Sequence, residues 1–231
     1  MSPVGAPFSV DHPLAVALDT PALDHLDQLA AQVAPHAGTL KVGLEAFAAH
    51  GPTALRVAAA HGPVLADLKL HDIPATVAGA AAAADHGVAA MTVHAAGGAE
   101  MIGAAVEAAP EVAVFAVTVL TSLSDDALAA QGCPPTKELV PRLAVLAVEA
   151  GAAGVVCAPD DVALVRAAVG GEAVVVTPGV RPAGWGANDQ RRVTTPAQAR
   201  AAGADLVVVG RPVTRADDPA SAAKALLDEL G

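Results

Sequence analysis

The stretch VLADLKLHDIPATV at residues 64–77 carries the residues best suited to chemistry. It begins as an apolar run, yet it contains Asp67, Lys69, His71 and Asp72. Successive side chains of a β-strand point to opposite faces, so Asp67, Lys69 and His71 share one face while apolar residues occupy the other. Opposite charges on one face of an otherwise apolar strand indicate a functional charge array rather than ordinary core packing.

Three further polar residues lie in or at the end of other apolar runs, namely Asp19, Lys41 and His94. Each has a structural alternative, such as an ion pair for a lysine or a hydrogen-bonded core position for the histidine. Asp72 also has one, because it could cap a helix that begins near Pro74. Together the residues are harder to explain in this way, because burying lysines and aspartates without mutual pairing costs on the order of several kcal/mol per ion. An alternating Asp–Lys–Asp–Lys array would keep every member ionised.

The elements that must position these residues are eight short apolar runs separated by alanine-rich helical stretches. Strands joined by crossover helices pair in parallel, and nearly continuous apolar strands fit a sheet that is covered on both faces. The pattern predicts an α/β fold, a (β/α)8 TIM barrel that forms a single catalytic domain over residues 1–231, with a doubly wound open sheet as the alternative. The expected strands are 14–19, 39–44, 64–70, 89–95, 111–120, 154–159, 173–179 and 206–212.

Several helix ends carry recognisable signals. Thr20 and Pro21 are expected to be the N-cap and first residue of the first helix, and Gly87 and Gly203 are expected to close later helices. The segment 124–132 predicts an extra helix inserted after the fifth strand.

A second site is expected after strands seven and eight. The stretch TPGVRPAGWGANDQRR at 177–192 contains three glycines and three arginines, and GRPVT follows at 210–214. Loops at these positions of such barrels commonly bind phosphate through backbone N–H groups and a charged side chain. Gly210 would allow close approach, Arg211 would supply charge, and the longer loop could act as a lid.

The charge distribution supports an anionic ligand. The formal net charge of −11 argues against non-specific binding to nucleic acid. Arginines nevertheless gather in the segment 181–215, whose only acids are Asp189 and Asp205. A small anionic ligand would explain this segment, and an ordinary solvated surface is the alternative. The arginines are Arg181, Arg191, Arg192, Arg200, Arg211 and Arg215.

The first residues, MSPVGAPFSV, contain no basic segment followed by an apolar run, so we expect a cytoplasmic protein without a membrane anchor. Cys133 and Cys157 are far apart and form no Cys-x-x-Cys pair. They predict neither a disulfide nor a zinc site, and Cys157 is expected to be a small core residue.

Together these motifs resemble the orotidine 5′-phosphate decarboxylase family over nearly the whole chain. Leu70 and Ala75 depart from the Phe and Asn that the family often has, and neither change removes a charged group. The matching motifs are ALD at the end of the first strand, KVG at 41–43, DLKLHDIPATV at 67–77, TVLTS at 118–122, TPGVRPAG at 177–184, NDQ at 188–190 and VGRPVT at 209–214.

The resemblance implies decarboxylation of orotidine 5′-monophosphate to uridine 5′-monophosphate (UMP) and CO₂ in pyrimidine biosynthesis, without cofactor or metal. Lys69 is then expected to stabilise and protonate the carbanion at C6, within an array that includes Lys41, Asp67 and Asp72. Asp19, with Lys41, is expected to hold the ribose hydroxyls.

The resemblance also implies the remaining contacts. Thr121 and Ser122 would bind the pyrimidine, and Pro178 would contact the substrate. Gln190, Gly210 and Arg211 would bind the phosphate, with Arg181 supporting the lid. Asp72, Ile73 and Thr76 would enter the site of the neighbouring subunit, so a homodimer with shared active sites is expected. His71 and His94 are left with structural or supporting roles.

Two alternatives remain open at this point. One is a Mg²⁺-dependent sugar-phosphate decarboxylase or aldolase of the same superfamily, which is similar at Asp67-x-Lys69-x-x-Asp72. The other is a barrel that only binds a phosphorylated metabolite, which would leave two buried lysines without a purpose.

Overall fold

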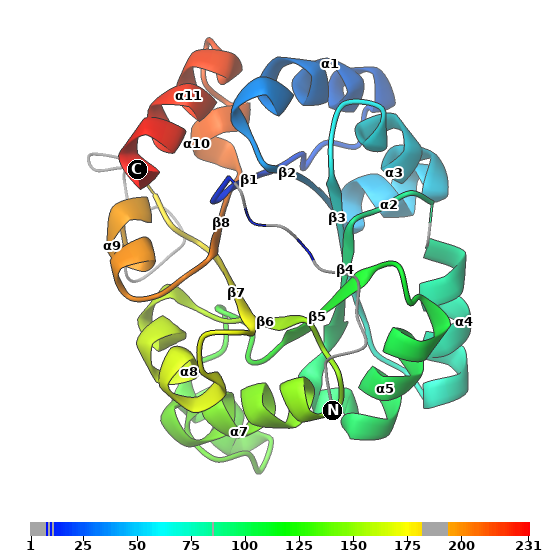
Figure 1. The fold of residues 1–231 in the computed structure, drawn as a ribbon, viewed down its shortest axis with the longest axis vertical. Coiled ribbons are helices and arrows are strands. Elements are labelled where there is room, and N and C mark those ends of the chain that lie inside the picture. The colour runs from blue at the N-terminus through cyan, green and yellow to red at the C-terminus, as the bar shows by residue number, and fades with distance from the viewer. Residues whose placement is uncertain (1–7, 9, 11, 85, 182–193) are drawn as a thin grey trace.

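The strands of the protein form one closed barrel. The computed structural model describes residues 8, 10, 12–84, 86–181 and 194–231. Eight parallel strands pair in sequence order, and β8 closes the ring by pairing with β1 (Figure 1). The predicted TIM barrel is therefore confirmed, and the alternative of an open doubly wound sheet is wrong.

All eight strands lie within the predicted segments, but seven of them are shorter. The apolar residues that extended the predictions are buried without belonging to a strand: Leu18 and Cys157 are only 0% and 1% exposed. Asp19 therefore follows the first strand rather than ending it. The strands are β1 (Leu14–Ala17), β2 (Thr39–Gly43), β3 (Val64–Leu70), β4 (Ala90–His94), β5 (Ala113–Val117), β6 (Gly154–Val156), β7 (Val174–Pro178) and β8 (Leu206–Val209).

Helices surround this ring (Figure 1). Among the described residues, no helix combines the length and apolar character needed to span a membrane. The helices are α1 (Leu23–Val33), α2 (Leu44–His50), α3 (Pro52–Ala59), α4 (Pro74–Ala84), α5 (Ala99–Ala108), α6 (Asp125–Ala130), α7 (Thr136–Glu149), α8 (Val162–Val169), α9 (Pro196–Ala201), α10 (Arg211–Thr214) and α11 (Pro219–Leu230), with short 3₁₀ turns η1 (Ala34–His36), η2 (Ala95–Gly97) and η3 (Pro159–Asp161).

The predicted start of the first helix is wrong by two residues. The N-cap of α1 is Ala22, and the Thr20 hydroxyl instead accepts a hydrogen bond of 3.3 Å from the Ala22 N–H, before the helix begins. A Thr-Pro pair is compatible with a helix start, but here it forms the turn that leads into one.

Of the three other predicted helix signals, two are confirmed and one is not. Gly203, with φ +109°, directly follows the C-cap Ala202 of α9, as its freedom to adopt positive φ predicts. Gly87 also has positive φ, but α4 already ends at Ala84. The inserted helix is confirmed as α6, whose N-cap Ser124 accepts a hydrogen bond from the Ala127 N–H.

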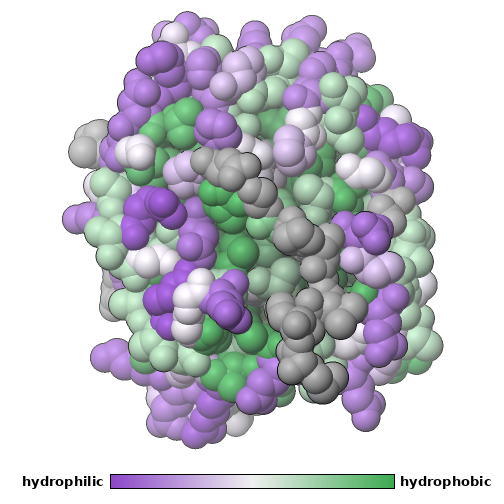
Figure 2. Space-filling view, viewed as in Figure 1, coloured by the Kyte–Doolittle hydropathy of each residue, from purple (hydrophilic) through white to green (hydrophobic). Residues whose placement is uncertain are grey.

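Two hydrophobic layers hold the barrel together. The larger one packs the outer faces of the strands against the helices. The smaller one lies inside the barrel, where Phe115 meets Phe8 edge to face with ring centroids 5.2 Å apart. Figure 2 shows hydrophobic side chains gathered over the barrel opening on the viewed face, with hydrophilic ones more frequent around the rim.

Candidate active site

Four charged side chains form a continuous chain at the carboxyl ends of the first three strands. Lys41 Nζ lies 3.2 Å from Asp19 Oδ1 and 3.4 Å from Asp67 Oδ2. Lys69 Nζ donates to the other oxygen, Asp67 Oδ1, at 2.7 Å. Each cation thus contacts at least one carboxylate, and the order Asp–Lys–Asp–Lys is the one that the sequence suggested.

The alternation of side chains along each strand explains why Lys41 and Asp67 both face the barrel interior. Lys41 on β2 and Asp67 on β3 occupy the same alternating phase as the apolar interior residues Ala15 and Leu65. The barrel interior is therefore apolar along the earlier part of these strands and charged at their carboxyl ends. A Cβ atom added to Gly43 would lie only 3.0 Å from the Asp19 carboxylate and 3.1 Å from the Lys41 ammonium, so the KVG motif leaves room for this pair.

Asp67 stays ionised despite its surroundings. Burial alone would raise the pKa of its carboxyl group, but the charges of Lys41 and Lys69, together with hydrogen bonds from Lys69 and Thr92, lower the pKa below its ordinary value. The site therefore holds a carboxylate between two ammonium groups at neutral pH.

Thr92 on β4 is the member of this cluster that the sequence did not single out. Its hydroxyl donates to Asp67 Oδ1 at 3.0 Å and accepts from the Lys69 backbone N–H at 2.9 Å. Its position between Ala90 and His94, in the interior phase of a predicted strand, was the one available signal.

A cavity of about 320 Å³ opens above these groups. Apolar residues such as Val117, Val156, Val176 and Val208 line part of its wall. Mixed apolar walls with a few convergent polar groups are typical of small-molecule sites. The predicted site residues that line it are Asp19, Lys41, Asp67, Lys69, Thr121, Pro178, Arg181, Gly210 and Arg211.

The other predicted site residues lie elsewhere. Asp72, Ile73 and Thr76 are exposed where the chain leaves β3 and enters α4, outside the cavity lining. Ser122 is exposed next to Thr121 and is also absent from the lining. Gln190, and residues 182–192 of the loop at 177–192 that could act as a lid, lie outside the described residues.

The basic segment divides into cavity residues and structural residues. Arg211 begins α10 directly after its N-cap Gly210, and both line the cavity. Arg181 is buried at the cavity wall, and its backbone N–H donates to the Thr194 carbonyl. Arg200 instead donates to backbone carbonyls of the α9–β8 turn, so its charge serves the fold.

The two histidines of the motif form a pair beside the array. The rings of His71 and His94 have centroids 5.4 Å apart, and neither residue lines the cavity. Burial, His71 and Lys69 lower the pKa of His94, against an opposing effect of Asp67. Across the described part of the chain, no group of His, Cys, Asp or Glu side chains is arranged to hold a metal ion.

A closed (β/α)8 barrel with a charged cavity at the carboxyl ends of its strands and arginines after β7 and β8 is the architecture of a TIM-barrel enzyme that acts on a small anionic molecule. Comparison with known proteins specifies the family. Residues 12–226 match the model described as "Orotidine 5'-phosphate decarboxylase / HUMPS family". The chain therefore belongs to this family.

Individual relatives agree with the family match. The chain is 57% identical over 222 residues to "Orotidine 5'-phosphate decarboxylase" of Thermobifida fusca, covering 94% of this chain and 95% of the relative. It is 59% identical over 217 residues to the protein of the same name from Anaeromyxobacter sp. (strain K), covering 92% and 96%. The crystal structure of orotidine 5'-phosphate decarboxylase from Lactobacillus acidophilus superposes with a TM-score of 0.85 at 37% identity, covering 96% of this chain and 100% of that one.

Proposed function

We propose that this protein removes CO₂ from orotidine 5′-monophosphate and releases UMP. The observation that carries the proposal is the Asp19–Lys41–Asp67–Lys69 chain at the cavity, in a protein whose relatives bear the name of this activity. We further propose that residues 1–231 form one catalytic domain that works in the cytoplasm as part of pyrimidine biosynthesis.

The reaction needs a cation at the reacting carbon. Breaking the bond between C6 and the carboxylate releases CO₂ and leaves the electron pair on C6, where the ring offers little resonance to spread it. The Lys69 ammonium, held at 2.7 Å from Asp67 and lining the cavity, is suited to stabilise that charge. It then gives its proton to C6, and the resulting amine regains a proton from solvent.

Asp67 and Lys41 prepare this step. Because Asp67 is held as a carboxylate, it fixes the Lys69 side chain at 2.7 Å before the reaction. It would also repel the substrate carboxylate, and departure of CO₂ would relieve that repulsion. Lys41 offsets the charge of Asp67 on its other side and, with Asp19, offers groups that can hydrogen-bond to ribose hydroxyls.

The remaining substrate contacts are proposed from the motifs shared with the family, and several of these residues line the same cavity. Thr121 and Pro178 line it and are proposed to contact the pyrimidine, with Ser122 beside them. Gly210, Arg211 and Gln190 are proposed to bind the phosphate, and Arg181 to support the loop that follows it. The phosphate does not react, so its binding energy is available to hold the charged groups in their working geometry.

We propose that the protein acts as a homodimer in which Asp72, Ile73 and Thr76 complete the site of the partner. The surface where α4 begins supports this, because Ile73 is 65% exposed and the Asp72 carboxylate accepts a hydrogen bond from the Ile73 N–H instead of joining the array of its own chain. The exposed residues Ala75 and Gly79 of α4 are small and uncharged, as a packed interface allows.

A spectrophotometric assay tests the proposal. Loss of orotidine 5′-monophosphate should be catalysed by the purified protein and should survive extensive treatment with a chelator, since Lys69 supplies the cation that a metal would otherwise provide. Loss of activity with chelator and recovery with Mg²⁺ would favour the sugar-phosphate decarboxylase or aldolase. Binding of UMP without turnover would favour a barrel that only binds a phosphorylated metabolite.

A further inference from the structure

The backbone of Lys69 has an unusual conformation. Its φ of +51° lies in the left-handed region, and among the described residues it is the one non-glycine residue with positive φ. The pairing of β3 with β4 shifts register between Ala66 and Leu70, so the ladder is irregular at the position of Lys69. Such conformations persist where surrounding contacts hold them, and they occur preferentially at functional sites.

Thr92 supplies the contact at this irregularity. Its hydroxyl accepts the Lys69 backbone N–H at 2.9 Å, in place of a carbonyl of the neighbouring strand. Thr92 is 1% exposed and is held in β4 by pairing with Phe115 of β5. The acceptor for the Lys69 N–H is therefore part of the rigid barrel.

The same hydroxyl orients Asp67. It donates its single hydrogen to Asp67 Oδ1 at 3.0 Å, the oxygen that also accepts from Lys69 Nζ at 2.7 Å. Asp67 Oδ2 then faces Lys41 at 3.4 Å. One hydroxyl thus links the backbone of the proposed proton donor to the carboxylate that holds its ammonium.

We infer that Thr92 is a positioning residue for the reaction. It fixes the left-handed backbone of Lys69 and the rotation of Asp67 together, so that the ammonium is directed into the cavity before substrate binds. The inference rests on the proposed decarboxylation. It goes beyond it, because Thr92 acts through Lys69 and Asp67 and the proposed chemistry assigns it no role of its own.

The test compares Thr92→Val, which keeps the branched shape but loses the hydroxyl, with Thr92→Ser, which keeps the hydroxyl. Small misplacements of reacting groups are costly, so Thr92→Val should lower kcat by roughly 10- to 100-fold while KM changes little. Thr92→Ser should retain most of the wild-type kcat. Because the Thr92 bond contributes to the low pKa of Asp67, its loss should also move the acidic limb of the activity profile to higher pH.

Thr118→Val is the matched control. Thr118 is also buried next to the barrel strands, but its hydroxyl donates to the Val156 carbonyl at 3.0 Å, and it does not line the cavity. It should lower thermal stability without changing kcat or the pH profile. If Thr92→Val fails to fold, Thr92→Ala, which leaves a small space, takes its place with the same expectations.

Wild-type kcat and an unchanged acidic limb in Thr92→Val or Thr92→Ala would overturn the inference while leaving the proposed function intact. A Thr92→Ser enzyme as impaired as Thr92→Val would also overturn it, because the hydroxyl would then not be the effective group. A wild-type protein without decarboxylase activity would overturn the proposed function, and this inference with it.

Discussion

At the scale of single residues, the array depends on each ion having an opposite charge beside it. Lys41 is only 9% exposed and contacts Asp19 and Asp67 on its two sides. Removing Asp67 would take away the carboxylate that pairs with Lys69 and leave Lys41 with Asp19 alone, and breaking a buried ion pair in this way typically costs about 3–5 kcal/mol. Replacement of Lys41 or Asp67 would therefore disturb stability as well as chemistry, whereas residues that are proposed to bind phosphate can be replaced with less effect on stability.

Arg211 provides such a test. A charge-assisted contact with phosphate contributes about 1.5–3 kcal/mol. Arg211→Ala should therefore weaken UMP binding by roughly 10- to 150-fold while leaving the affinity for uridine nearly unchanged, as measured by calorimetric titration. Arg215→Ala is the control, because Arg215 lies one turn further along at the C-cap of α10 and outside the cavity lining. Equal losses for UMP and uridine would show that Arg211 does not bind phosphate.

The residue types at the site were predictable because charges are rare in buried strands. Asp67 and Lys69 stood out for that reason. Lys41 shares the interior phase of Asp67 on the neighbouring strand, whereas Asp19 follows β1. Thr92 was not predictable in the same way, because threonine is common in strands and its importance depends on the register shift opposite Lys69. A bulge is a relation between two strands, and one strand's sequence does not reveal it.

At the scale of elements, the barrel order was predictable and the element ends were not. Apolar runs separated by helical stretches require parallel pairing, and eight such units in a chain of this length favour the sequential strand order of a closed barrel over a doubly wound sheet. Burial continues past the last paired residue, however, so the run at 111–120 contains a strand of only Ala113–Val117. Hydrophobicity reports burial, whereas the end of a strand is set by its hydrogen bonds.

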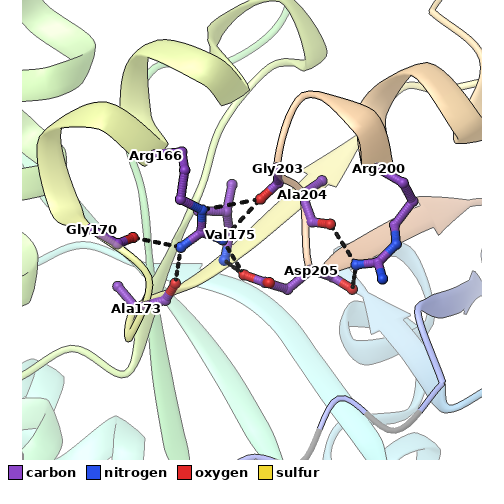
Figure 3. Close-up of polar contacts among 8 residues, drawn as sticks. All are labelled: Arg166, Gly170, Ala173, Val175, Arg200, Gly203, Ala204 and Asp205. Atoms are coloured by element: carbon purple, nitrogen blue, oxygen red, sulfur yellow. Dashed lines mark hydrogen bonds and ion pairs between the residues drawn. The ribbon is translucent and has the colours of Figure 1, made fainter.

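A cluster around Arg166 links the connections that lead into β7 and β8 (Figure 3). Arg166 of α8 donates to the carbonyls of Gly170, Ala173 and Gly203 and pairs with Asp205. The Asp205 carboxylate also accepts from the backbone N–H of Val175 at 2.7 Å, at the start of β7. The cluster therefore joins the α8–β7 and α9–β8 connections through a single guanidinium group.

Arg166→Ala should lower the free energy of unfolding by about 2–4 kcal/mol, because several carbonyls and one carboxylate lose a charged donor. Arg166→Lys should recover little, since one ammonium cannot span the fork of a guanidinium. Urea denaturation measures both effects. The control is Arg142→Ala, which removes an ion pair with Glu138 between side chains that are 68% and 56% exposed, and should change stability by less than about 1 kcal/mol. Similar losses for Arg166→Ala and Arg142→Ala would contradict a structural role for the cluster.

At the scale of the whole molecule, the two ends of the barrel differ. Phe115 and Phe8 fill the interior on one side, and the charged chain with its cavity occupies the other. Asp72 and Ile73 stand exposed next to this second end, outside the cavity of their own chain. The sequence motif placed Asp72 close to Lys69 along the chain, but sequence distance alone does not decide which subunit's site Asp72 serves.

Mixed dimers decide this question. Lys69→Ala and Asp72→Asn should each be nearly inactive as homodimers. If Asp72 completes the partner's site, a mixed dimer contains one site with both lesions and one site with neither. Random reassortment of equal amounts in a twofold dimer makes about half of the dimers mixed, so about a quarter of all sites should be wild-type in composition. Decarboxylation should return accordingly once the two proteins have been unfolded together and allowed to reassemble.

Differently tagged chains confirm that mixed dimers have formed, and each variant reassembled alone gives the background activity. If Asp72 acts within its own chain, every site in a mixed dimer still carries one lesion. Activity would then stay at the level of the separate variants, and the shared site would be refuted whether or not the protein forms dimers. Recovery to about a quarter of the wild-type activity would instead require Asp72 to cross the interface, because in no other arrangement does a mixed dimer contain an intact site.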